Sequence, residues 1–266
     1  MALSNLKSNR TTLSSQLIKI FIAFLFLQYH NVNSQYSQSP IPSQQLSPSE
    51  TFSFSITEFD EQNQNIFLGG DASTSGGILR LTKTDEYGKP LQNSVGRVTH
   101  FTPIHIWDKA SGELADFSVG FSFNVNTNGS RLHGDGFTFF IGPVHFELPK
   151  NSSGGFTNGW DPATPSQFPH IGIDVGSIDS VATVNWPIDF VQTNALGVAS
   201  INYNSESKKL SVFVVYPGSE REGISVSSIV DLRSVLPEWV RVGFTASTGE
   251  LVETHDIINW SFESAL

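Results

Sequence analysis

Candidate metal-binding donors are concentrated in the loop-rich stretch from Gly154 to Ser180. This stretch carries the carbonyl of Phe156, the amide of Asn158, the carboxylate of Asp161 and the imidazole of His170. Oxygen donors two or three residues apart can surround a hard cation, and a histidine beside a carboxylate suits manganese. Spacing alone favours a cation site and an ordinary surface loop about equally. Calcium takes about 6–8 oxygens, whereas this loop offers one carboxylate.

Short alternating apolar runs predict the strands that must position this loop. Residues 117–123 alternate apolar and small side chains with the two-residue period of a half-buried strand, and residues 52–56 and 210–215 do so similarly. Turn-forming pairs at 128–129 and 248–249 separate such runs. The pattern predicts an all-β domain of two packed antiparallel sheets, a sandwich or jelly roll, with one short helical turn between residues 227 and 239.

The first 34 residues have the pattern of a secretory signal. Lys7, Arg10 and Lys19 form a positive region, and an apolar run over residues 20–27 precedes the small residue Ser34. We expect cleavage after Ser34, and the apolar run is too short to span a bilayer.

Three regions follow from this reading. Residues 1–34 form the signal peptide, residues 35–49 form a Gln/Ser/Pro-rich disordered leader, and residues 50–266 form one folded domain.

Composition excludes several classes of function. The formal net charge of −10 argues against nucleic acid or an anionic membrane surface as a partner, and the absence of cysteine excludes a thiol nucleophile. Neither a Gly-x-Ser-x-Gly elbow nor the paired carboxylates of a glycosidase occur. Asn128 and Asn151 begin Asn-x-Ser sequons in turn-like stretches and are candidate glycan sites, whereas Asn259 lies in an apolar run and should be buried.

A series of motifs resembles the legume lectins over essentially the whole of residues 50–266. The motifs are SVGR from Ser94, PIHIWD from Pro103, GDGFTFFIGP from Gly134, HIGIDVGSI from His170, LPEWVRVGFTASTG from Leu236 and ETHDIINWSF from Glu253.

The resemblance implies a concanavalin-like jelly-roll β-sandwich. It also implies secretion to the extracellular space or the vacuole, glycosylation, assembly as a homodimer or homotetramer, and no enzyme activity. The expected partners are glycans or glycoproteins, whose monosaccharides or oligosaccharides are bound with the help of calcium and manganese.

Roles in a shallow pocket follow residue by residue from the resemblance. Asp135, after a cis peptide bond from Gly134, would accept hydrogen bonds from sugar hydroxyls, and Gly155 would donate its backbone N–H. Asn158 would contact both calcium and the sugar, while Phe156 would stack on the sugar and lend its carbonyl to calcium.

The remaining positions complete the metal centre and the rim of the pocket. Asp161 would bridge both ions, His170 would bind manganese and Ser180 would lie in the outer shell. Glu250 and Leu251 would rim the pocket and tune which sugar fits.

One segment of the family pattern has no counterpart in this chain. Family members have a strand with Glu-x-Asp before the aromatic-x-Asn element, but here Gly154-Gly155 runs directly into Phe156. A manganese-binding Glu and a shared Asp are therefore missing, and Asp161 alone opposes two divalent cations. We predict greatly weakened metal binding.

The missing segment leaves alternatives open. The chain could be a lectin-like storage or defence protein that has lost metal-dependent sugar binding. His145 and Glu147 mimic the spacing of the lost pair, although a loop after Pro143 fits the pattern better. An incomplete gene model is a third explanation, because losing an interior strand would leave the neighbouring ladders unpaired.

Overall fold

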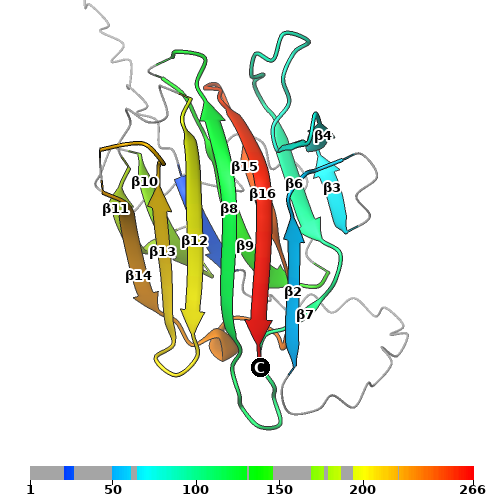
Figure 1. Cartoon of the computed structure of the whole chain (residues 1–266), viewed down its shortest axis with the longest axis vertical. Coiled ribbons are helices and arrows are strands. Elements are labelled where there is room, and N and C mark those ends of the chain that lie inside the picture. Colours follow the sequence, from blue (N-terminus) through cyan, green and yellow to red (C-terminus); the bar gives the residue numbers. More distant parts are fainter. Residues whose placement is uncertain are drawn as a thin grey trace, which may run out of the picture.

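The structure of the chain is a computed structural model that describes residues 21–26, 50–60, 65–130, 132–145, 169–176, 179–186, 194–220 and 222–266. Two eight-stranded sheets pack face to face, as the alternating apolar pattern predicts (Figure 1). We call them sheet A and sheet B.

Sheet A carries the site described below. Its strands, in spatial order, are β11 (Ser180–Asn185), β10 (His170–Val175), β1 (Phe21–Phe26), β9 (Gly136–Pro143), β15 (Trp239–Ser247), β6 (Val95–His100) and β3 (Ile66–Gly70), with β7 (Ile104–His105) paired to β15.

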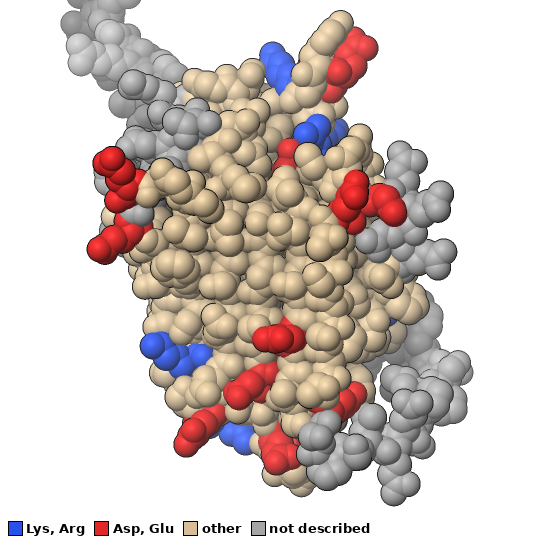
Figure 2. Space-filling view, in the orientation of Figure 1, with Lys and Arg blue, Asp and Glu red and all other residues tan. Residues whose placement is uncertain are grey.

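Sheet B faces the viewer in Figure 1. Its strands, in spatial order, are β14 (Ile224–Ile229), β13 (Lys209–Val215), β12 (Leu196–Asn204), β8 (Asp116–Asn126), β16 (Thr254–Ala265), β5 (Ile78–Arg80) and β4 (Ser73–Ser75), with β2 (Thr51–Ile56) paired to β16. Figure 2 shows this face, on which charged side chains gather toward the two ends and leave an uncharged band across the middle.

Aromatic side chains from both sheets form the core between them. Phe121 of β8 and Trp260 of β16 each contact the ring of Phe244 on β15, with ring centroids 5.0 Å apart in both cases. All three side chains are at most 1% exposed. Burying a side chain of this size stabilises the fold by about 1.5–3 kcal/mol, so the alternation in the sequence determines which face of each strand turns inward.

The predicted helical turn is present as the 3-10 helix η1 (Leu232–Ser234). Asp231 caps it by accepting a hydrogen bond from the backbone N–H of Arg233, and Leu232 is buried beneath it. The predicted strands at 52–56, 117–123 and 210–215 are confirmed as parts of β2, β8 and β13.

The position between β9 and β10 is occupied by β1, from the segment expected to be the apolar part of a signal peptide. Phe21–Phe26 pairs with His170–Val175 of β10, and Ile22–Phe26 pairs with Phe137–Ile141 of β9. Both pairings are parallel, whereas every other pair of described strands is antiparallel.

The loss of an interior strand is expected to leave the neighbouring strands without hydrogen-bonding partners, and the parallel pairing of β1 supplies such partners. In the full chain β1 is a hydrogen-bonding neighbour of both β9 and β10 and lies between them. Removal of residues 1–34 is a question of how the chain is processed, and the fold of the full chain does not test it. Cleavage after Ser34 therefore stays a prediction.

Candidate functional site

Asp135 lies at the start of β9, directly after a cis peptide bond from Gly134. Its backbone N–H donates to the carbonyl of Ser247 at 3.0 Å, and the Ser247 hydroxyl lies 3.4 Å from Asp135 Oδ2. The side chain of Asp135 is half-buried, and its Oδ1 makes no hydrogen bond with the described residues. A half-buried carboxylate whose backbone is held in place can accept hydrogen bonds from a ligand.

Hydrogen bonds to the segment before β6 hold the loop after β15 in place beside Asp135. The backbone N–H of Thr248 donates to Ser94 O at 2.9 Å, and the Thr248 hydroxyl donates to Leu91 O at 2.7 Å. Gln92 Nε2 donates to the carbonyl of Glu250 at 2.7 Å. The Glu250 side chain is exposed and Leu251 is half-buried, so the rim keeps its position while its side chains stay available.

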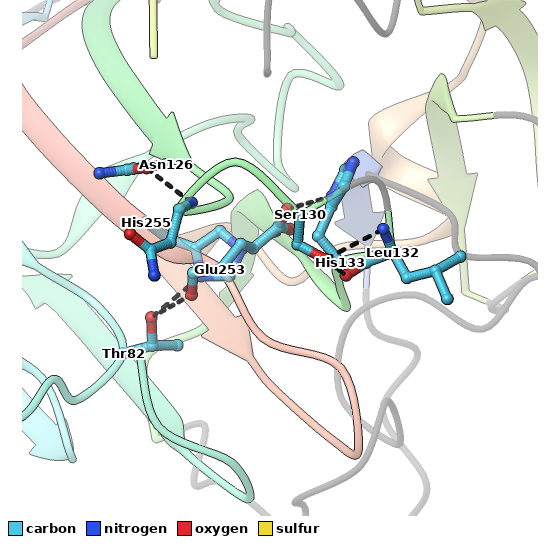
Figure 3. Close-up of polar contacts among 8 residues, drawn as sticks. Thr82, Asn126, Ser130, Leu132, His133, Glu253 and His255 are labelled. Carbon is cyan, nitrogen blue, oxygen red and sulfur yellow. Dashed lines mark hydrogen bonds and ion pairs between the residues drawn. The ribbon is translucent and has the colours of Figure 1, made fainter. Parts of the chain in front are cut away.

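The buried carboxylate of Glu253 lies between the imidazoles of His133 and His255 (Figure 3). Glu253 Oε2 is 2.6 Å from His133 Nδ1, and Glu253 Oε1 is 2.9 Å from His255 Nε2. Thr82 Oγ1 lies 3.1 Å from His255 Nδ1 on the other side of that ring. All four side chains are completely buried, so the network holds the loop carrying His133 against the strand carrying His255.

Burial and these partners shift the carboxyl pKa values in opposite directions. Burial by itself disfavours the charged form of Glu253, but hydrogen bonds and charge interactions with His133 and His255 outweigh it and lower the Glu253 pKa to about 2. Burial raises the pKa of Asp135, and the nearby Glu253 charge adds to that effect while His255 opposes it. The site therefore combines a firmly ionised interior carboxylate with a more easily protonated outer one.

Several predicted site residues lie outside the described residues. These are Gly155, Phe156, Asn158, Asp161, the glycan candidate Asn151 and Glu147 of the alternative metal pair. His145 lies in a turn after β9, which agrees with a loop following Pro143.

His170 is the described member of the predicted metal centre. It is the first residue of β10 and is fully buried. Ser180, expected in the outer shell, donates its hydroxyl to Asp174 Oδ1 at 2.5 Å. Asp174 of β10 is thus a buried carboxylate beside Ser180, four positions along the strand from His170, which the sequence pattern did not single out.

The donors that the sequence predicts for this centre are few for a two-ion site, and weakened metal binding stays a prediction. The predicted donors comprise one carbonyl, one amide, one carboxylate and one imidazole, which is too few oxygens for calcium and too little negative charge for two divalent cations. Within the described residues, the side chains close enough to share an ion are His105, Asp108 and Glu238, whose ligand atoms lie within 4.8 Å of one another. They lie at the opposite end of β15 from Asp135, because His105 pairs with Trp239.

The two sequons with described asparagines differ in their surroundings. Asn128 is exposed in a turn with Gly129, where both residues have positive φ. Asn259 is half-buried, and its Nδ2, the atom that would carry a glycan, donates to Ser122 Oγ at 3.1 Å.

The legume lectin domain matches this chain over residues 51–158 and 155–265. The chain belongs to the legume lectin family. Lectin 9 of Medicago truncatula is 71% identical over 280 positions that cover 96% of this chain and 99% of that protein. Lectin 10 of the same plant is 65% identical over 291 positions that cover all of both chains. Because this chain has 266 residues, about 25 of those 291 positions have no counterpart in it.

Solved legume lectin structures confirm the predicted concanavalin-like β-sandwich. Lectin I-B4 from Griffonia simplicifolia, in a metal-free form, superposes with a TM-score of 0.72 at 32% identity, covering 81% of this chain and 100% of that one. The basic winged bean lectin, solved with the Tn antigen, superposes with a TM-score of 0.73 at 33% identity, covering 81% and 98%.

Membership of this family assigns carbohydrate recognition rather than enzymatic turnover to the chain. None of the described helices has the length and apolar character needed to cross a membrane.

Proposed function

We propose that this chain is a secreted lectin that binds a monosaccharide or oligosaccharide against Asp135. The observation that carries the proposal is the Asp135 carboxylate, whose backbone is tied to Ser247 while Oδ1 makes no hydrogen bond with the described residues. Hydrogen bonds from sugar hydroxyls to an ionised carboxylate are roughly twice as strong as neutral ones. The exposed Glu250 and half-buried Leu251 on the fixed rim are suited to select among sugars.

The same proposal includes weak dependence on calcium and manganese. It is supported by the single carboxylate in the predicted ligand set. Residues Phe156, Asn158, Asp161 and His170 would be the remaining donors. This observation also favours a second candidate function, a storage or defence protein with the lectin fold that no longer binds sugar through metal.

A glycan array of the full chain, with and without EDTA, separates these functions. The lectin function predicts glycan signal that EDTA changes little, and the variant Asp135→Asn should lose affinity roughly tenfold or more. Asp85→Asn is the matched control, since Asp85 is a half-buried loop carboxylate that accepts hydrogen bonds from the backbone N–H groups of Tyr87 and Lys89. Absence of glycan signal under both conditions supports the storage or defence function. Complete loss with EDTA refutes weak metal dependence.

Secretion to the extracellular space or the vacuole, glycosylation and assembly complete the proposal. The positive region and short apolar run at the N-terminus support removal of residues 1–34, and N-terminal sequencing of protein secreted by plant cells tests it. Asn128 in its exposed turn is the better-supported glycan site, and Asn151 is the second. Light scattering of the purified chain distinguishes a homodimer from a homotetramer.

A further inference from the structure

A cavity of about 360 Å³ lies on the outer face of sheet A, away from the Asp135 loop. Its described lining comes from β3, β6, β9 and β15 and the turn after β9, and comprises Phe67, Arg97, Thr99, Phe140, Pro143, Val144, His145 and Arg241. None of these side chains is acidic, although the whole chain carries a formal net charge of −10. We call this feature the arginine pocket.

The register of the sheet explains the shape of the arginine pocket. Phe140, Gly243, Thr99 and Phe67 form one row across four strands, since each is the pairing partner of the next. Gly243 contributes no side chain, and a Cβ added there would lie 2.9 Å from atoms of the Phe140 ring. The absent side chain at Gly243 leaves room for the buried Phe140 ring, which packs over that position, while the exposed Phe67 ring borders the other end of the row.

Two polar groups in the pocket lack hydrogen-bond partners among the described residues. Thr99 is 8% exposed and its buried Oγ1 has no hydrogen-bond partner. Arg241 is half-buried, and its buried Nε also has no hydrogen-bond partner. Among the residues that the structure describes, no carboxylate pairs with Arg241, and burial lowers its pKa. A buried donor without an acceptor costs about 1–3 kcal/mol, more when it is charged, and an incoming acceptor removes that cost.

The aromatic side of the pocket offers a platform beside the positive charge. The Arg241 guanidinium lies 5.2 Å from the centroid of the Phe67 ring. Phe67 is 44% exposed and contacts the ring of Phe101, which is 50% exposed, at a centroid distance of 5.1 Å. Two large apolar rings exposed side by side suit a flat apolar ligand surface.

We propose that the arginine pocket binds a carboxylate whose body packs against Phe67. The carboxylate oxygens would accept hydrogen bonds from the Arg241 guanidinium and the Thr99 hydroxyl, which gives both groups the partner they lack. This site stands apart from Asp135: Phe140 is four positions after Gly136 on β9, a distance of about 13 Å along the strand.

A carboxylate of this kind has two sources that differ in the rest of the ligand. It can belong to a free aryl carboxylic acid, or to a uronic acid unit in a glycan that also reaches Asp135. Only the second source rests on the proposed sugar site, so a variant at Asp135 distinguishes them.

The test is fluorescence or calorimetric titration of the full chain with 2-naphthoate and with 2-naphthalenemethanol. The first ligand carries a carboxylate, and the second has a hydroxymethyl group in its place. We expect naphthoate to bind at least tenfold more tightly than the alcohol. Arg241→Gln should weaken naphthoate binding at least tenfold, Thr99→Val several-fold, and Arg241→Lys less than Arg241→Gln. Arg233→Gln is the matched control, because Arg233 is already paired with Asp231, and it should leave binding unchanged.

The second arm uses a disaccharide that carries glucuronate and its neutral glucose counterpart. A preference for the glucuronate that is lost in both Arg241→Gln and Asp135→Asn identifies an acidic glycan as the ligand. Naphthoate binding that survives Asp135→Asn identifies a free acid. Equal binding of acid and alcohol, unchanged affinity in a folded Arg241→Gln variant, or no binding of either acid overturns the proposal.

Discussion

Replacing Glu253 with glutamine tests how the interior of the site is held together. Glu253 is completely buried and accepts hydrogen bonds from His133 at 2.6 Å and His255 at 2.9 Å. A neutral amide has a single oxygen, so it can accept from one imidazole while its NH₂ group faces the other. The variant therefore removes one acceptor and the negative charge between two ring nitrogens.

The size of the effect can be worked out in two ways. Removing one partner from a buried charged pair costs about 3–5 kcal/mol. The lowering of the Glu253 pKa from 4.5 to about 2 corresponds to roughly 3 kcal/mol of preferential stabilisation of the charged form. We therefore expect Glu253→Gln to lower the free energy of unfolding by about 3–4 kcal/mol.

Urea unfolding at neutral pH, followed by tryptophan fluorescence, measures this loss. Glu263→Gln is the control, since Glu263 is an exposed residue that accepts a hydrogen bond from Ser118; it should change the free energy by no more than about 0.5 kcal/mol. A loss below about 1 kcal/mol in Glu253→Gln, with an unchanged denaturant slope, refutes the reasoning.

The pH dependence gives an independent check with a definite sign. The pKa of Glu253 is lower in the folded chain than its ordinary 4.5, so its contribution is fully present above pH 4.5 and is lost as pH falls toward 2. The difference in stability between the original chain and Glu253→Gln should shrink over that interval. A difference that stays constant from pH 5 to pH 2 contradicts an ionised Glu253.

Two further predictions concern the sheets. Ala23→Pro in the full chain removes a backbone N–H from β1 between β9 and β10 and should lower the free energy of unfolding by about 1–3 kcal/mol. The control Gln38→Pro, in the leader, should leave the stability unchanged, and equal melting temperatures for the two variants would show that β1 does not support the sheet. Phe121→Ala should cost about 3–5 kcal/mol because the ring is buried against Phe244, and calorimetry should show a much smaller loss for Phe101→Ala, whose ring is 50% exposed.

The local sequence pattern was sufficient to predict these strands and to recognise the family. The alternation in residues 117–123 appears in the structure as β8, and the motif around Asp135 carries the cis peptide bond that the resemblance implies. Alternation predicts strands because consecutive side chains of a strand point to opposite faces, so the types of neighbouring residues indicate which face is buried.

The partners of charged side chains could not be read in the same way. His133 looks like one of several scattered histidines in the sequence, yet it lies 2.6 Å from Glu253, which is 120 residues away. Thr99 and Arg241 carry no local signal either, and they meet because β6 and β15 are neighbours in sheet A. The pairing partner of a strand depends on how the whole chain folds, and spacing within one segment does not contain it.

The N-terminal apolar run shows the same division between sequence and structure. Composition determined that residues 20–27 are apolar, and the resemblance to the legume lectins predicts that this chain lacks a strand carrying two acidic residues. Only the tertiary structure decided that Phe21–Phe26 pairs between β9 and β10 in the full chain. The physical reason is that the backbone N–H and C=O groups of two interior strands require partners, and any extended segment within reach can supply them.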